Sequence, residues 1–144
     1  MAKITPKAMR TALKAKLDEQ GALLTQQRVA VYEYLHRTAQ HPTAEEVFLA
    51  VKQTLPKISL ATVYKNLEAL VACGAASKLT YGDAAARYDI RTDHHYHARC
   101  LQCGRVVDVE PAAQAELADE IRAPRGFRVE HYRIEAVGYC RQCQ

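Results

Sequence analysis

Residues 94–103 read HHYHARCLQC and end in a Cys-x-x-Cys pair, and residues 140–143, CRQC, form a second pair. Four thiols arranged two and two are typical of a tetrahedral zinc site whose ligands all come from the protein. Such a closed site stabilises structure and leaves no coordination position for a reaction. We therefore predict a structural zinc ion with four cysteine ligands: Cys100, Cys103, Cys140 and Cys143.

Three histidines, His94, His95 and His97, stand directly before the first cysteine pair. In a strand, His95 and His97 point to one side and His94 points to the other. Asp89 would end the preceding strand, and Asp108 would lie on the strand that follows the zinc turn. Two imidazoles and two carboxylates suit Fe(II), Mn(II) or Zn(II). The sequence therefore predicts a second metal site, whose ion can exchange.

His41 lies far from this segment in the sequence, directly before Pro42 and between two predicted helices. It is either an ordinary loop histidine or a metal ligand that bridges the two halves of the chain. The sequence pattern alone leaves both interpretations open.

The first part of the chain predicts helices over residues 7–20, 26–38, 43–51 and 60–72. Thr25 and Ser59 are expected N-caps, and Thr43 with Glu46 forms a capping box. Two short alternating segments, 76–81 and 87–91, flank a Gly-Asp turn and predict a β-hairpin. Helices followed by a hairpin are the order of a winged helix-turn-helix, in which helix 60–72 would read the DNA groove.

The second part predicts strands over residues 95–100, 105–109 and 127–139, with a helix over 111–123. About 50 residues give too small a core for independent stability, and a zinc site is the usual remedy. We therefore expect an α+β protein. Its N-terminal winged helix-turn-helix, residues 1–91, is followed by a small α/β dimerisation domain with a four-cysteine zinc site, residues 92–144.

Charge is distributed unevenly along the 144 residues, whose net charge is +4. Residues 1–91 carry 13 Lys/Arg against 8 Asp/Glu, whereas residues 92–144 carry 7 against 8. A basic first half suits a polyanion such as DNA. No apolar run approaches the ~20 residues that span a bilayer, and residues 1–10 lack the apolar core of a signal peptide. We therefore expect a cytoplasmic protein with no membrane partner.

Helix 60–72 has two distinct faces, because Val63, Leu67 and Leu70 share one side and are expected in the core. On the other side, four residues are expected at base edges or phosphates: Ala61, Thr62, Tyr64 and Lys65. Basic residues elsewhere, among them Lys14 and Arg28, would hold phosphates and fix the position of the protein on DNA. A half-site reader of this size normally binds palindromic operator DNA as a homodimer.

Four motifs of this chain, taken together, resemble the ferric uptake regulator (Fur) superfamily of metal-dependent repressors. They are HPTAEE at 41–46, SLATVYKNL at 59–67, HYH at 95–97 and the two cysteine pairs. The chain most resembles the peroxide-sensing (PerR) branch, in which an aspartate stands at the position of Asp108, where iron sensors usually have glutamate.

The resemblance implies a regulatory Fe(II) or Mn(II) ion held by His41, Asp89, His95, His97 and Asp108. By the same resemblance, hydrogen peroxide would oxidise His41 or His95 of the Fe(II) form, and loss of that ligand would release DNA. Manganese would support DNA binding without the oxidation.

Three other interpretations compete with a peroxide-responsive repressor. The first is a manganese-, iron- or zinc-homeostasis repressor of the same superfamily. The second is a mononuclear iron oxygenase, which the numerous candidate ligands disfavour because such enzymes leave coordination positions open. The third is a zinc-ribbon adaptor, which leaves the winged-helix half unexplained. The sequence therefore favours a regulator and not an enzyme.

Overall fold

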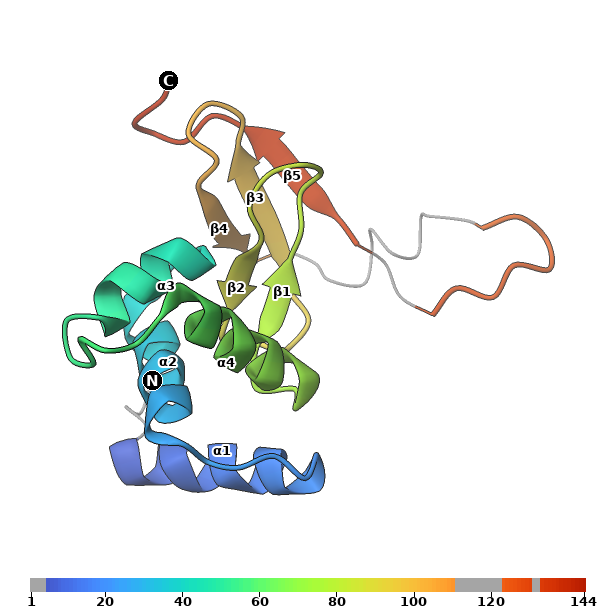
Figure 1. The fold of residues 1–144 in the computed structure, drawn as a ribbon. Helices are drawn as coiled ribbons and strands as arrows, with labels where there is room; N and C mark the ends of the chain where they lie inside the picture. The colour runs from blue at the N-terminus through green and yellow to red at the C-terminus, as the bar shows by residue number, and fades with distance from the viewer. Residues whose placement is uncertain (1–4, 111–122, 131–132) are drawn as a thin grey trace. The chain divides into compact units, whose positions relative to one another are not determined.

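The structure is a computed structural model that describes residues 5–110, 123–130 and 133–144. It divides into two compact units, Met1–Thr92 and Asp93–Gln144. The first unit contains four helices and a β-hairpin, and the second contains a three-stranded sheet (Figure 1). The α+β fold class predicted from the sequence is confirmed. Among the described residues, no helix has the length and apolar character needed to cross a membrane.

The helices of the first unit are α1 (Pro6–Glu19), α2 (Gln26–Thr38), α3 (Ala44–Val51) and α4 (Leu60–Ala72). Each begins after a hydroxyl side chain that accepts a hydrogen bond from a main-chain N–H of the first turn: Thr5, Thr25, Thr43 and Ser59. Such caps satisfy donors that the helix itself leaves unpaired. The local sequence therefore determines where these helices start.

The core of the first unit is built from one apolar stripe of each helix. Its fully buried side chains include Leu13 and Leu17 of α1, and Val63 and Leu67 of α4. Tyr88 is also completely buried, and it brings the hairpin into the same core. Burial of such side chains is the main favourable term in folding.

The hairpin consists of β1 (Ser77–Leu79) and β2 (Arg87–Asp89), paired antiparallel with Ser77 opposite Asp89. Gly74, at φ 72°, ends α4 in the left-handed region that glycine tolerates, and the chain then turns towards β1. On its other side, β2 pairs with the loop before α3 through an isolated bridge between Thr43 and Arg87. The hairpin is therefore tied to both α4 and this loop.

The second unit contains β3 (Tyr96–Cys100), β4 (Val106–Val109) and β5 (Glu135–Gly138), in the order β4-β3-β5. β3 pairs antiparallel with β4 and parallel with β5. The strand predicted over 127–139 is shorter in the structure: among its described residues, only Glu135–Gly138 pair with β3, opposite His97 to Cys100. The helix predicted over 111–123 lies, except for its last residue, outside the described residues.

Candidate metal centres

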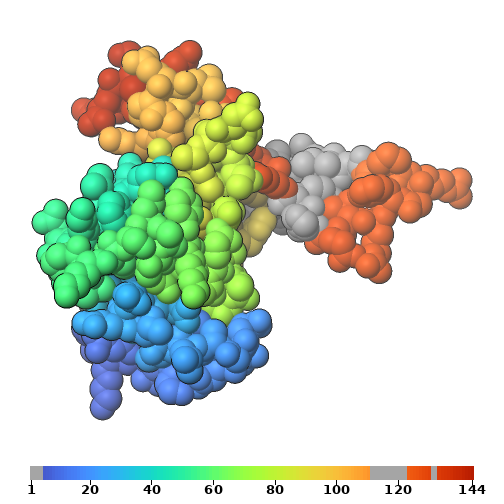
Figure 2. All heavy atoms as spheres, in the orientation of Figure 1, coloured from blue at the N-terminus to red at the C-terminus, as the bar shows by residue number. Residues whose placement is uncertain are grey.

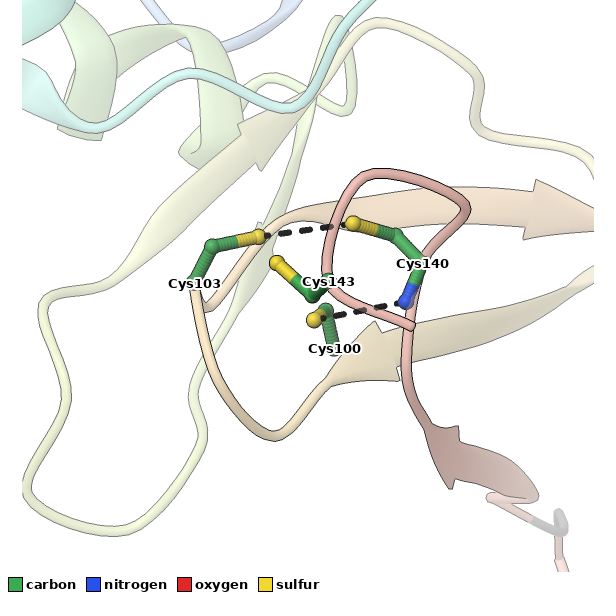
Figure 3. Close-up of side chains that lie close together, drawn as sticks. All are labelled: Cys100, Cys103, Cys140 and Cys143. Atoms are coloured by element: carbon green, nitrogen blue, oxygen red, sulfur yellow. Dashed lines mark hydrogen bonds between the residues drawn. The ribbon is translucent and has the colours of Figure 1, made fainter.

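The four cysteines of the two Cys-x-x-Cys pairs converge on one point of the second unit (Figure 3). Cys100 ends β3 and Cys103 lies in the turn that follows, whereas Cys140 and Cys143 follow β5. Their sulfur atoms all lie within 4.8 Å of one another, and the Sγ atoms of Cys103 and Cys140 are 3.8 Å apart. Tetrahedral Zn–S bonds of ~2.3 Å would place sulfurs about 3.8 Å apart, so the cluster has the dimensions of a zinc site with four cysteine ligands.

The pKa values of two of these thiols are shifted in opposite directions. Main-chain hydrogen bonds from Cys103 and Cys140 lower the pKa of Cys100 to about 6. Hydrogen bonding to Cys140, together with burial, raises the pKa of Cys143 to about 12. Cys100 therefore gives up its proton more readily than Cys143. A divalent cation that replaces these protons satisfies all four sulfurs.

Two of the predicted regulatory ligands, His41 and Asp89, lie together in the first unit. Nε2 of His41 is 3.2 Å from Oδ2 of Asp89, and both side chains are only 5% exposed. Asp89 ends β2, and its other carboxylate oxygen accepts a hydrogen bond of 2.8 Å from the main-chain N–H of Arg91. One carboxylate oxygen is thus held by the backbone while the other faces an imidazole.

The position of His41 follows from the way its loop is attached to β2. The carbonyl oxygen of His41 accepts a hydrogen bond of 2.8 Å from Nη1 of Arg87. The next carbonyl, that of Pro42, accepts one of 2.9 Å from the main-chain N–H of Tyr88. These bonds align the loop with the strand that carries Asp89, so two side chains far apart in the chain meet.

The other three predicted ligands, His95, His97 and Asp108, lie together in the second unit. The register of β3 and β4 places His97 opposite Asp108. Oδ1 of Asp108 is 3.1 Å from Nε2 of His95 and 3.5 Å from Nε2 of His97. Both imidazoles therefore turn the same nitrogen towards one carboxylate, as the alternation of a strand predicts.

The tautomer of His95 is set by a main-chain contact. Nδ1 of His95 lies 2.7 Å from the carbonyl oxygen of Asp93, which can only accept a hydrogen bond. The proton of a neutral imidazole then resides on Nδ1, and Nε2, which faces Asp108, carries the lone pair that can bind a cation. Metal-binding histidines in proteins are commonly held by such a contact.

Each unit by itself thus contains nitrogen and carboxylate donors of the kind that bind Fe(II), Mn(II) or Zn(II). His41 with Asp89, and His95 and His97 with Asp108, form two donor sets of this chemistry. Imidazole and carboxylate donors fit an exchangeable divalent cation, whereas the four thiols fit a permanently bound zinc ion.

The residues predicted to read DNA lie on α4 as the helical pattern predicts, with Val63, Leu67 and Leu70 fully buried on the opposite side. Ala61 and Lys65 are exposed and Thr62 is half-buried. Tyr64 is 39% exposed. The helix thus presents a mixed polar surface beside its apolar core face.

The two basic residues predicted at phosphates differ in their surroundings. Lys14 is exposed, and its Nζ lies 2.6 Å from Oδ2 of Asp18. Arg28 is only 9% exposed. Its guanidinium donates to Oδ1 of Asn66, at 3.2 Å, and to the carbonyl oxygen of Leu23. Arg28 therefore joins α2 to α4 inside the unit, and its guanidinium is already bonded there rather than directed at a phosphate.

Sequence reasoning missed three residues that position the candidate functional side chains. Arg87 anchors the loop of His41, the main-chain carbonyl of Asp93 orients His95, and Glu45 accepts a hydrogen bond from Tyr64. The contacts of Arg87 and Glu45 join segments far apart in the chain, so no spacing rule signals them. The contact of Asp93 with His95 is local but depends on the bend of the main chain between them. For Glu45, the one available signal is an acidic residue in the first turn of α3, which also has a purely helical explanation.

The order of the two units along the chain and the chemistry of their donor sets are typical of a metal-binding transcription regulator. The Ferric uptake regulator family matches residues 19–137 of the chain. The chain therefore belongs to this family, whose members are transcriptional regulators and not enzymes.

Within the family, the chain is similar to regulators of the peroxide response. It is 41% identical to the peroxide operon regulator of Bacillus subtilis (strain 168) over 127 residues, 88% of each chain. It is 39% identical to the peroxide-responsive repressor PerR of Staphylococcus aureus (strain USA300) over 130 residues, 90% of this chain and 88% of the relative. The fold matches that of the Helicobacter pylori ferric uptake regulator Fur with a TM-score of 0.80 and 23% identity, covering 99% and 97% of the two chains.

Proposed function

We propose that this protein is a metal-dependent, peroxide-responsive transcriptional repressor, which binds palindromic operator DNA as a homodimer in the cytoplasm. The observation that carries the proposal is the placement of Asp108, whose Oδ1 lies within 3.5 Å of Nε2 of both His95 and His97. An aspartate in this role is the feature in which the chain resembles peroxide sensors. Relatives about 40% identical to it are named for the peroxide response.

The regulatory ion would be held by both donor sets at once. His41 and Asp89 belong to the first unit, and His95, His97 and Asp108 belong to the second. An ion bound by all five would favour the arrangement of the units in which its donors meet. It can bias that arrangement only by the difference between its affinities for the alternatives.

Fe(II) held by these residues would supply the redox chemistry by which hydrogen peroxide transfers one oxygen atom to the imidazole of His41 or His95, with water as the other product. Either oxidation removes an imidazole donor. Because these histidines lie in different units, loss of either one weakens the link between the units. Mn(II), which is harder to oxidise, would hold the same donors without damage to them.

The first unit would bind DNA and the second would form the dimer. Residues of α4 would enter the major groove: Ala61, Thr62, Tyr64 and Lys65. Lys14 on α1 would contact a phosphate. To do so it would give up its exposed ion pair with Asp18, and such exposed pairs contribute only ~0–1 kcal/mol to stability. The four clustered cysteines would hold structural zinc within the second unit.

The test compares zinc-containing protein loaded with Fe(II) or Mn(II). The probe is a duplex that the Mn(II)-loaded protein itself selects from a random-sequence library, and binding is followed by fluorescence anisotropy. We expect both metals to support binding and hydrogen peroxide to abolish it only for the Fe(II) form. Mass spectrometry of peptides containing His41 and His95 should show an added oxygen atom under the same conditions.

The same experiment separates this proposal from its nearest alternative, a manganese-, iron- or zinc-homeostasis repressor, because the donor sets suit all three metals. If the Fe(II) form keeps its DNA affinity and intact histidines after peroxide, the protein is a homeostasis repressor. If no metal promotes selection of any duplex, the repressor proposal itself is wrong.

A further inference from the structure

A hydrogen bond joins α4 to the start of α3 on the surface of the first unit. Tyr64 donates from its Oη to Oε1 of Glu45, with 2.9 Å between the oxygen atoms. The two residues are 19 positions apart in the chain, and α3 and α4 lie side by side on the face shown in Figure 2. Both side chains are exposed, so a macromolecule that contacts α4 at Tyr64 also meets this pair.

The position of Glu45 is fixed by the capping box that begins α3. The main-chain N–H of Thr43 donates to Oε2 of Glu46 at 2.8 Å, and Glu46 returns a main-chain hydrogen bond to Oγ1 of Thr43 at 3.3 Å. Glu45 therefore starts from a well-held first turn, where the helix dipole favours a negative charge.

The chemistry of the two groups decides the direction of the hydrogen bond. A carboxylate has no proton to give, whereas a phenol has one. The contact with Glu45 also raises the pKa of Tyr64, so the hydroxyl remains protonated. While the contact persists, the one proton of Tyr64 points at Glu45, and its oxygen can only accept a further hydrogen bond.

In the described part of the chain, no basic group lies within salt-bridge distance of Glu45. By contrast, Glu68 on the same surface lies 2.8 Å from Nζ of Lys78. A carboxylate without a paired cation repels phosphates when it lies on a surface that contacts DNA. The favourable place for Glu45 and Tyr64 is therefore beside base edges that offer hydrogen-bond donors.

We propose that Glu45 is a specificity-determining residue that acts through Tyr64, an inference that rests on the proposed binding of operator DNA. By holding the phenolic proton, Glu45 makes Tyr64 a hydrogen-bond acceptor with an exposed ring. Such a group matches the amino groups of adenine N6 or cytosine N4, and its ring can contact the methyl group of thymine. It does not match O6 and N7 of guanine or a phosphate oxygen, because these also only accept.

The experiment uses full-length, zinc-containing, Mn(II)-loaded protein and the duplex that the wild-type protein selects from a random library. Each base pair of one half-site is replaced in turn, and the affinity of every duplex is measured by anisotropy. The variants are Glu45→Ala, Glu45→Gln, Tyr64→Phe and the double variant Glu45→Ala/Tyr64→Phe. Glu19→Ala, which removes an exposed carboxylate at the end of α1, is the control for net charge.

We expect Glu45→Ala to reduce discrimination at one base-pair position by about tenfold, in favour of guanine. Glu45→Gln should retain most of the preference, because its amide oxygen still accepts the phenolic proton. In the Tyr64→Phe background, Glu45→Ala should change no base preference further, since Glu45 has no hydroxyl to orient. Glu19→Ala should alter affinity uniformly and leave every preference in place.

Two results would overturn the inference while leaving the proposed function intact. One is a Glu45→Ala variant whose base preferences match those of the wild type. The other is an equal effect of Glu45→Ala with and without the hydroxyl of Tyr64, which would show that Glu45 acts without the tyrosine. If the wild-type protein selects no duplex at all, the proposed function fails, and this inference fails with it.

Discussion

Replacing Arg28 by alanine distinguishes a residue that holds the fold from one that holds a phosphate. Its basic character and position at the start of α2 predict a phosphate contact, yet its guanidinium is buried and bonded within the unit. The variant leaves Oδ1 of Asn66 and the carbonyl oxygen of Leu23 without their donor. Asn66 is only 3% exposed, so water reaches its oxygen poorly.

The size of the effect follows from these two contacts. A hydrogen bond to a charged group contributes about 1.5–3 kcal/mol, and an unsatisfied buried acceptor costs a similar amount. The two bonds are not additive, because the alanine variant admits some water. We therefore expect Arg28→Ala to lower the free energy of unfolding by about 3 kcal/mol. For a unit of this size, the loss corresponds to a fall in Tm on the order of 10–20 °C.

The assay combines urea unfolding with the salt dependence of DNA binding. At a temperature where the variant is still folded, Arg28→Ala should bind DNA with the same slope of log affinity against log salt as the wild type. Loss of a true phosphate contact reduces that slope by about 0.9 per contact, and Lys14→Ala is the matched comparison. A stable Arg28→Ala variant with a reduced salt slope would refute the structural role.

Three further predictions concern the proposed metal ligands and the acid stability of the first unit. His41→Ala should retain zinc and dimerisation but lose most of the Mn(II)-induced gain in operator affinity, and undiminished activation by Mn(II) would contradict the bridging role. Asp108→Glu should keep Fe(II)-dependent binding but show less histidine oxidation by mass spectrometry, and oxidation equal to that of the wild type would count against the aspartate. Contacts with Lys78 and Tyr88 lower the pKa of Glu68 below its ordinary value of 4.5. These contacts therefore stabilise the folded state fully above pH 4.5, and the stabilisation is lost as the pH falls through the lowered pKa. Glu68→Gln should flatten the acid limb of urea unfolding, and a limb as steep as that of the wild type would show that other carboxylates cause it.

Local signals predict most of the first unit. Thr25, Thr43 and Ser59 cap helices that begin at or within one residue of the predicted starts, because an N-cap is a property of a few consecutive residues. The Cys-x-x-Cys pairs likewise predict their own convergence, since few other arrangements satisfy four thiols in so small a unit.

Contacts between distant segments could not be predicted in the same way. The sequence leaves the role of His41 open, because the pairing of its loop with β2 depends on how the helices pack. The burial of Arg28 depends on Asn66, which lies 38 residues further along the chain. The strand predicted over 127–139 is too long because the alternation of side chains does not reveal where the partner strand ends.

The pairing of the loop of His41 with β2 has a consequence for metal selectivity. The Arg87 side chain donates a hydrogen bond to the carbonyl oxygen of His41, and the main-chain N–H of Tyr88 donates one to that of Pro42. A cation bound by His41 and Asp89 would therefore meet preorganised donors and lose little conformational entropy in ordering them. Rigid donors discriminate between cations by ionic radius, since they cannot move to accommodate a larger or smaller ion. If His41 and Asp89 bind the proposed regulatory ion, folding of the first unit would fix part of the cation preference before the ion binds. Lengthening Asp89 by a single methylene, as in Asp89→Glu, would disturb that preference more than the same change on a mobile loop.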